Sequence, residues 1–211
     1  MAVTRNPPPA AQTSQDALHA LLCEVLPAQG AWSDDAYLWL TDHSNRLIEF
    51  TDGLVEELPV PTFTHQAVLA FLYDLFRAYL KTRGGVVMFA ALRVRIRPGK
   101  FREADLLLLL DRTDPRCRDR YWLGADLVAE VVSPDNPDRD LVEKREDYAE
   151  AGIPEYWIAD PRDETIRVLT LQDTGYTEHG VYRRGETATS PLLAGFAAEV
   201  SAVFDAPTVG A

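Results

Sequence analysis

The stretch that decides the fold runs from Phe101 to Asp160 and contains the segments FREADLLLLL, LGADLVAEVVSP and EYWIAD. Each segment carries a short apolar run bounded by polar or turn residues, which is typical of strands buried on both faces of a sheet. Two carboxylates interrupt the pattern: Asp105 stands at the head of the first run, and Glu130 lies inside the second. Because carboxylates rarely enter such strands without a partner or a function, these two are the first candidate site residues.

The residues after Ser133-Pro134 predict a helix from Arg139 to Ala151, which ends at Gly152. It separates the strand that contains Glu130 from the strand EYWIAD. A strand, a helix and a second strand in this order predict a right-handed crossover that joins two parallel strands.

Lys144 differs from the other charged residues of this predicted helix. Four acids spaced three and four residues apart form its expected solvated face: Glu143, Glu146, Asp147 and Glu150. Lys144 lies three residues after Leu141 and four before Tyr148, so it belongs to the apolar face that packs on the sheet. A lysine there must extend to solvent or pair with a buried carboxylate, and Glu130 is the obvious partner. A purely structural Lys–Glu pair is the alternative, although such pairs contribute little net stability.

The N-terminal half predicts a short amphipathic helix over residues 16–26, a second helix after Ser33, and a β-hairpin over residues 46–58 around a Thr-Asp-Gly turn. A long helix follows, from Thr64 to Lys81. His65 lies on its apolar side, because it precedes Val68 and Leu69 by three and four residues. Two interpretations of His65 stay open: a core histidine with its hydrogen bonds satisfied, or a side chain that points into the cleft of the carboxylates.

The segment LRVRIRPG predicts a strand with an apolar face and a basic face that carries Arg93, Arg95 and Arg97. Residues 77–102 contain eight basic residues and no acid. We interpret the three arginines as a candidate DNA-binding surface that follows phosphates; a solvated strand face is the alternative. Because Pro98-Gly99 predicts a turn, this strand should run antiparallel to the one that contains Asp105.

After Asp163 the sequence predicts an antiparallel hairpin, and SPLLAGFAAEVSAVF closes the domain. With 211 residues, 46% hydrophobic and 26% charged, the chain fits one domain over residues 16–206 after a Pro-rich, disordered lead over residues 1–15.

No apolar run is long enough for a membrane span, and residues 1–15 lack the apolar core of a secretory signal. Two distant cysteines without metal spacing favour a reducing cytoplasm. The net charge of −12 argues against avid, non-specific binding of nucleic acid.

The combination of an Asp, a Glu and a Lys on adjacent core elements is typical of a metal-dependent phosphodiesterase. Phosphodiester hydrolysis needs charge neutralised on the non-bridging oxygens and a water made nucleophilic, and Mg²⁺ or Mn²⁺ supplies both. Asp105 and Glu130, with the backbone carbonyl of Val131, are the candidate ligands. Lys144 is the candidate to position the water and stabilise developing charge. The spacing alone is only moderately specific.

The segment ADLVAEVVSPDNPDRDLVEKREDYAEAGIPEYWIADP closely resembles the Uma2 family (DUF820), which is common in bacteria. The resemblance extends to RLIEFTDGLVEELP and FREADLLLLL, and so covers most of the chain. It implies an α/β fold with the restriction-endonuclease-like mixed sheet of the PD-(D/E)XK superfamily, flanked by helices, and a DNA endonuclease activity. It assigns Asp105 and Glu130 as metal-binding carboxylates and Lys144 as the family's lysine that has moved to the helix. Three further polar positions match it: Glu57, His65 and Asp140.

The sequence departs from the superfamily pattern at two positions. Ala104 replaces the proline before Asp105, and Val132 occupies the position of the in-strand lysine, so activity depends on Lys144 reaching the site. Two rival functions follow: a non-catalytic protein of this fold that binds nucleic acid or protein, and a metal-dependent hydrolase of a smaller phosphate ester. Trp122, expected to be exposed in a polar loop, suggests a homodimer.

Overall fold

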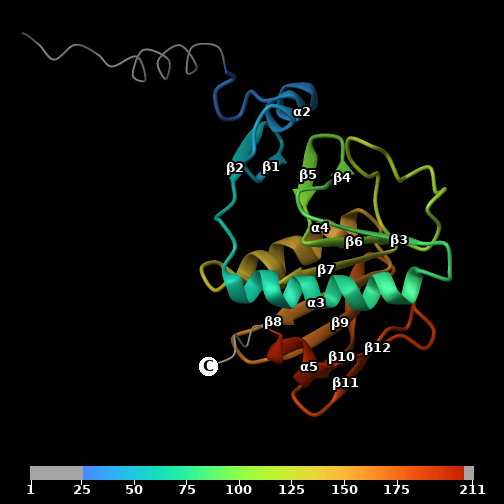
Figure 1. Cartoon of the computed structure of the whole chain (residues 1–211). Helices are drawn as coiled ribbons and strands as arrows, with labels where there is room; N and C mark the ends of the chain where they lie inside the picture. Colours follow the sequence, from blue (N-terminus) through green and yellow to red (C-terminus); the bar gives the residue numbers. More distant parts are fainter. Residues whose placement is uncertain (1–25, 207–211) are drawn as a thin grey trace, which may run out of the picture.

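The structure is a computed structural model that describes residues 26–206, and its largest element is a six-stranded mixed sheet with the order β10-β9-β8-β7-β6-β3 (Figure 1). Its strands are β3 (Val86–Phe89), β6 (Leu106–Leu109), β7 (Leu127–Val131), β8 (Glu155–Asp160), β9 (Thr165–Gln172) and β10 (Gly175–Tyr182). Strands β7 and β8 are parallel, as predicted, and every other neighbouring pair of this sheet is antiparallel. The predicted α/β class and the mixed sheet flanked by helices are confirmed.

A second, antiparallel sheet has the order β2-β1-β5-β4. Its strands are β1 (Ile48–Thr51), β2 (Leu54–Glu57), β4 (Arg93–Arg97) and β5 (Lys100–Glu103), and α2 (Asp34–Asp42) precedes it with Ser33 as its N-cap. The predicted hairpin is confirmed. The arginine strand β4 is antiparallel to β5, which ends before Asp105, and not to the leucine strand β6, which pairs with β3 and β7 in the other sheet. The chain passes from β5 into β6 through Ala104 and Asp105 alone, so Asp105 stands at the junction of the two sheets.

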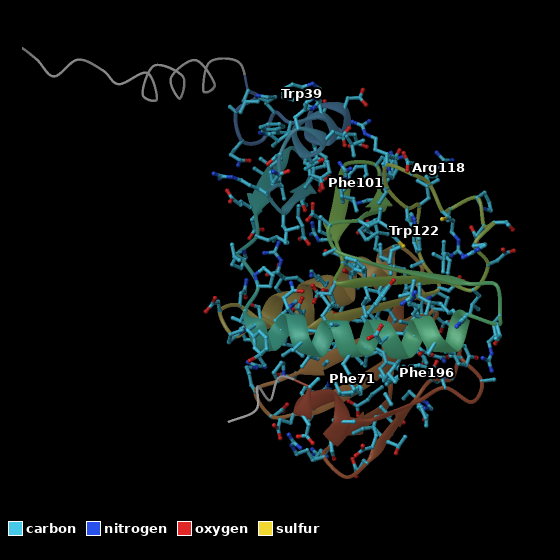
Figure 2. The ribbon with its side chains drawn as sticks, in the orientation of Figure 1. Trp39, Phe71, Phe101, Arg118, Trp122 and Phe196 are labelled. Atoms are coloured by element: carbon cyan, nitrogen blue, oxygen red, sulfur yellow. The ribbon has the colours of Figure 1, made fainter. Side chains whose placement is uncertain are left out.

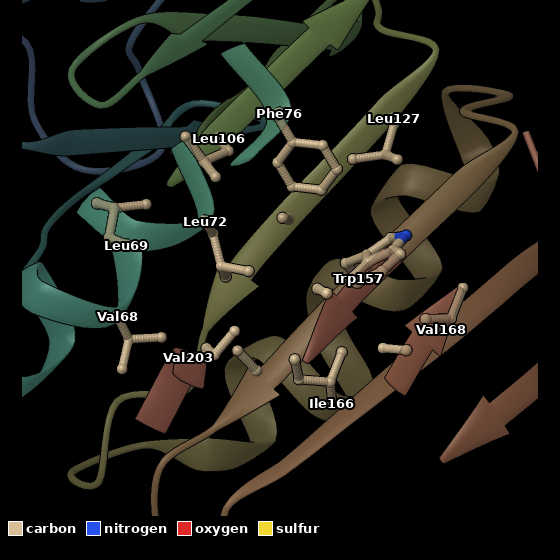
Figure 3. Close-up of a cluster of buried hydrophobic side chains, with 14 of the residues drawn as sticks. Val68, Leu69, Leu72, Phe76, Leu106, Leu127, Trp157, Ile166, Val168 and Val203 are labelled. Carbon is tan, nitrogen blue, oxygen red and sulfur yellow. The ribbon is translucent and has the colours of Figure 1, made fainter. Parts of the chain in front are cut away.

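The run of leucines in β6 is explained by helices on both faces of the six-stranded sheet. Leu106 and Leu108 pack with the long helix α3 (Phe63–Leu80), whereas Leu107 and Leu109 face the opposite cluster, which contains Tyr148. Figure 3 shows the α3 cluster, with Leu72 and Phe76 against the β7 and β8 side chains. Because successive strand residues point to opposite faces, a strand covered on both sides needs apolar residues at every position.

The predicted helix from Arg139 to Ala151 is two elements: a π-helical turn, η1 (Arg139–Glu143), and the helix α4 (Lys144–Glu150). The Lys144 N–H bonds to the carbonyl of Arg139, five residues earlier. Such a turn is wider than an α-helical turn and often occurs at functional sites. The first turn of α3 is also defined by a local bond, because the Thr62 side chain accepts a hydrogen bond from the His65 N–H.

The C-terminal part adds a small sheet of β11 (Thr187–Thr189) and β12 (Ala197–Glu199) and the helix α5 (Val200–Asp205), which packs in the α3 cluster. The predicted disordered lead over residues 1–15, and all but the last residue of the helix predicted over residues 16–26, lie outside the described residues. None of the helices in residues 26–206 is long and apolar enough to cross a membrane.

Trp122 is not exposed, which corrects the expectation on which the homodimer rested. Only 2% of it is accessible, and its backbone N–H and carbonyl bond to the backbone of Arg93 and Arg95 on β4. In Figure 2 Trp122 lies inside the fold, whereas Arg118 of the same loop lies at its outer side. This loop is polar in sequence, yet it places the Trp122 ring in the core.

Candidate functional site

A cavity of about 100 Å³ lies where the two sheets, the start of α3 and the η1 turn meet. Eight ionisable side chains line it: His65, Glu103, Asp105, Glu130, Asp135, Arg139, Asp140 and Lys144. They include five of the predicted site residues: His65, Asp105, Glu130, Asp140 and Lys144. Val131 also lines the cavity. The structure therefore brings together residues that are up to 79 positions apart, from His65 to Lys144.

Asp105 and His65 form a direct pair, with Nε2 of His65 at 3.0 Å from Oδ2 of Asp105. The same Oδ2 accepts the backbone N–H of Val131 at 2.8 Å. Burial raises the pKa of Asp105, but the hydrogen bond and charge of His65 outweigh it and hold that pKa below its ordinary value. Burial lowers the pKa of His65, and Asp105 more than reverses this, so that pKa is raised. The histidine predicted either for the core or for the cleft belongs to the cleft.

Lys144 connects the carboxylates of the cavity. Its Nζ lies 2.9 Å from Oε2 of Glu130 and 3.2 Å from Oδ1 of Asp140, and its side chain is 6% exposed. Burial lowers its pKa, but Glu130 and Asp140 outweigh burial and raise that pKa well above the ordinary value. Lys144 is therefore an ammonium group at neutral pH. The spacing of Lys144 to Leu141 and Tyr148 predicts a contact with Glu130, and the structure shows that contact.

Glu130 is fully buried, and protein groups contact both of its oxygens. Oε1 accepts the hydroxyl of Tyr148, and Oε2 accepts the backbone N–H of Asp105 at 3.3 Å as well as contacting Lys144. Burial raises the pKa of Glu130 well above its ordinary value, with Lys144 acting in the opposite direction. The carboxylate is thus held in one orientation by Tyr148 and Lys144 of α4 and by the backbone N–H of Asp105.

Two buried glutamates of this site were missed by the sequence analysis. Glu49, 1% exposed, accepts Arg139 at 2.7 Å and the backbone N–H of Glu103 at 3.2 Å, and its Oε1 lies 4.0 Å from Lys144 Nζ. Glu103 is 4% exposed and lines the cavity, and its Oε2 has no hydrogen-bond partner within residues 26–206. Burial raises the pKa of Glu103 to about 7. A signal was present in the sequence, because Glu103 shares a strand face with Phe101 two residues earlier.

The donors at the cavity suit a hard divalent cation that keeps most of its own water. Oδ1 of Asp105 forms no hydrogen bond or ion pair with any residue of the described part of the chain. Within residues 26–206, no group of three or more His, Cys, Asp or Glu side chains is arranged to hold a metal ion. Mg²⁺ commonly binds through one or two carboxylates, with waters and substrate oxygens completing its octahedron. Asp105 and Glu130, with the carbonyl of Val131, fit that smaller requirement.

Glu57 is not brought to the cavity. It ends β2, its side chain is 53% exposed, and it pairs with Arg46 at 2.6 Å. Two other glutamates of this hairpin reach the cavity-lining Arg139, the buried Glu49 on β1 and the exposed Glu56 on β2, each at 2.7 Å. The family position that Glu57 matches is therefore occupied by a surface residue in this chain.

The three strand arginines are paired inside the protein. Arg93 contacts Asp42 at 3.0 Å, Arg95 contacts Asp34 at 3.2 Å, and Arg97 contacts Asp52 and Glu150. The segment that contains no acid in the sequence thus receives its acids from α2, the β1–β2 turn and α4. None of the three arginines lines the cavity. Their role in DNA binding stays a prediction, and their charges are largely neutralised.

The helix face expected to be wholly solvated is interrupted by Asp147. This residue is 5% exposed, and it pairs with Lys100 and, at 2.7 Å, with Arg102 on β5. The prediction was wrong at this position because β5 passes over that side of α4 and supplies two cations. Asp147 therefore joins the helix to the smaller sheet.

Comparison with known proteins places this geometry in a family. A family model named Uma2 and described as "Putative restriction endonuclease" matches residues 34–201. A crystal structure described as a "putative nuclease belonging to DUF820", from Anabaena variabilis ATCC 29413, has a TM-score of 0.71 and 17% identity, and the alignment covers 84% of this chain and 99% of that one. Comparison with curated proteins gave no match. Because the family model spans most of the 211 residues, the chain belongs to the Uma2 family.

Proposed function

We propose that this protein is a divalent-metal-dependent nuclease that hydrolyses phosphodiester bonds in DNA. The observation that carries the proposal is the arrangement of Asp105, Glu130 and Lys144 at one cavity. Glu130 Oε2 lies 2.9 Å from Lys144 Nζ and 3.3 Å from the backbone N–H of Asp105. The description of the Uma2 family supports the reaction class.

The proposed metal ligands are Asp105, through Oδ1, Glu130, and the carbonyl of Val131; within residues 26–206, the contacts of the Asp105 carboxylate with Val131 and His65 use its other oxygen, Oδ2. Bound Mg²⁺ or Mn²⁺ would neutralise charge on the phosphate oxygens and lower the pKa of a water molecule. His65 holds the other oxygen of Asp105, Oδ2, and so orients the carboxylate. The excess of buried carboxyl groups over cations at the cavity favours uptake of a cation.

Lys144 acts through its charge and its N–H groups. Despite burial, Glu130 and Asp140 raise the pKa of Lys144 and so favour its charged form, and an ammonium donates hydrogen bonds and accepts none. Its position between Glu130 and Asp140 suits it to orient the attacking water and to stabilise negative charge that develops on the phosphate. Glu130 and Asp140 keep this ammonium in place, because a buried lysine without them would lose its charge.

The test is cleavage of supercoiled plasmid by purified protein with Mg²⁺ or Mn²⁺. Asp105→Asn and Lys144→Ala should each lower the rate by about 10²–10³-fold, the usual cost of removing one stabilising group. Glu178→Gln is the control, because Glu178 is an exposed carboxylate that pairs only with Arg167 within the described residues. Metal-dependent cleavage that survives both site substitutions would show that the activity comes from another site or a contaminant.

A non-catalytic protein of the same fold that binds nucleic acid is the second candidate. Two observations favour it: Val132 replaces the in-strand lysine, and both oxygens of Glu130 are engaged by protein groups. Binding of duplex DNA without cleavage in Mg²⁺ or Mn²⁺ would select this candidate. A smaller phosphate ester as substrate would instead appear as hydrolysis of a chromogenic phosphodiester by a protein that leaves the plasmid intact.

A further inference from the structure

A second cavity, of about 720 Å³, lies at the end of α3 that is opposite to the candidate site. It is bounded by the C-terminal half of α3 and by β3, the edge strand of the six-stranded sheet (Figure 1). We call it the cationic groove, because its charged lining contains three cations, Arg77, Lys81 and Arg112, and one acid, Asp74. In a chain with a net charge of −12, this is a local excess of positive charge.

Within the part of the chain that the structure describes, the cations of the groove differ from the strand arginines in forming no ion pair. Within residues 26–206, Arg77, Lys81 and Arg112 form no ion pair, and all three are exposed. Arg93 and Arg97, in contrast, contact acids at 3.0 Å and 2.7 Å. The positive charge that remains available to an external anion is thus in the groove and not on the arginine strand.

The helix dipole alone does not explain this cluster. Arg77 lies in the last turn of α3 and Lys81 is its C-cap, where cations interact favourably with the dipole. Arg112, however, follows β6 and is held beside the helix end by its backbone N–H, which donates to the Gly84 carbonyl at 3.0 Å. The turn after α3 can lie this close to the end of β6 because residue 85 is glycine: a Cβ there would lie 2.7 Å from the Leu109 carbonyl oxygen. Arg112 is therefore brought to the groove by a backbone hydrogen bond between the turn after α3 and the turn after β6.

The groove and the candidate site lie toward opposite ends of the α3–β3 pair. His65 and Ala90 line the site, whereas Arg77 and Met88 line the groove, so β3 leads back from the groove to the site. Between them the rings of Tyr73 and Phe89 pack edge to face, with their centroids 5.1 Å apart. His65 and Arg77 are twelve residues apart on α3, which corresponds to about 18 Å along the helix axis. That is the length of about five base pairs of B-form DNA at roughly 3.4 Å per step.

We propose that the cationic groove binds the phosphate backbone of duplex nucleic acid, about five base pairs away from the phosphate at the candidate site. The identity of the ligand rests on the proposed function, whereas its anionic character rests on Arg77, Lys81 and Arg112. The groove supplies the phosphate contacts that the paired arginine strand does not. Such contacts position a duplex without reading its sequence.

The experiment measures binding and needs no cleavage. The affinity of a fluorescein-labelled 30-base-pair duplex is determined by anisotropy in EDTA, from low to moderate NaCl, for the wild type and for Arg77→Gln/Arg112→Gln. Two lost phosphate contacts should reduce the slope of log Kd against log salt by about 2 and weaken binding about tenfold at low salt. Arg118→Gln/Arg183→Gln is the matched control, because it removes two exposed arginines whose side chains form no ion pair within residues 26–206. It should behave like the wild type.

An equal loss of duplex affinity in the two double variants would overturn the proposal, because binding would then depend on the total charge of the protein and not on the groove. Absence of duplex binding by the wild type would overturn it as well, and preferential binding of poly-glutamate would indicate an acidic protein partner instead. The Asp105→Asn variant separates the two proposals. It should lose plasmid cleavage and keep the wild-type slope of log Kd against log salt, because the groove binds the duplex independently of the reaction. A wild type that binds with the expected slope but never cleaves supports the groove and rejects the nuclease.

Discussion

Two groups of ion pairs in this protein join a cation to carboxylates but differ in their exposure to water. In the first, which we call the buried cluster, Lys144 contacts Glu130 and Asp140 with side chains that are at most 6% exposed. In the second, the strand pairs, Arg95 contacts Asp34 with 28% and 31% exposed. Water screens the second group and leaves the charges of the first to interact at a low effective dielectric. The comparison shows why the sign of the charges says little about a site until their burial is known.

The largest expected effect is that of Lys144→Met, which removes the cation of the buried cluster and leaves Glu130 and Asp140 uncompensated. The free energy of unfolding should fall by about 3–5 kcal/mol, the usual cost of breaking a buried pair from one side. Urea unfolding measures it. Arg95→Met, the matched removal of a cation from the strand pairs, should cost no more than about 1 kcal/mol. Equal losses would remove the distinction between the two groups.

Glu103→Gln should change how stability depends on pH. The pKa of Glu103 is raised from 4.5 to about 7, so the folded state holds a proton that the unfolded state releases, and stability falls as pH rises from 4.5 to about 7. Gln cannot ionise, so the variant should be more stable than the wild type at pH 8 by roughly 3 kcal/mol at most, and equally stable near pH 4. Urea unfolding at the two pH values tests this. A constant difference would show that packing, not ionisation, is responsible.

Asp147→Asn should have an intermediate effect, because Asp147 is buried while its partners Lys100 and Arg102 are partly exposed. We expect a loss of about 1–3 kcal/mol, since the change weakens charge-assisted hydrogen bonds to two cations. Glu146→Gln on the same helix is the control, because Glu146 is exposed. Thermal unfolding of both variants measures the contrast. A larger loss for Glu146→Gln would contradict the assignment of Asp147 as the residue that joins α4 to β5.

The smallest expected effect is the coupling within a strand pair. A double-mutant cycle of Arg95→Gln and Asp34→Asn should give a coupling energy below about 1 kcal/mol, because the pair is partly solvated. The coupling should decrease further in 1 M NaCl, where the Debye length is about 3 Å. A coupling energy above about 2 kcal/mol that does not decrease in 1 M NaCl would show that water does not screen the strand pairs, and the two groups would then not differ.

The sequence predicted those parts of the site that follow from local periodicity. Lys144 was assigned to the inner face of its helix from the spacing to Leu141 and Tyr148, and the structure places it at Glu130. Glu103 was missed although it shares a strand face with the buried Phe101, and Glu49 was missed because a single glutamate in a short strand gives no signal until the burial of its face is known. Glu57 was carried over from the family pattern, and the structure leaves it on the surface with Arg46.

The spacing of apolar residues is enough to predict the main elements: the buried strands β6, β7 and β8, the parallel crossover, and the amphipathic α3. Which charges are available to a ligand, in contrast, depends on the contacts made across the fold. Arg93, Arg95 and Arg97 form the most basic pattern in the sequence, yet acids from α2, the β1–β2 turn and α4 neutralise them. The reason is physical: side-chain periodicity is a property of neighbours along the chain, whereas a charge is compensated by whichever side chain folding brings within a few ångströms.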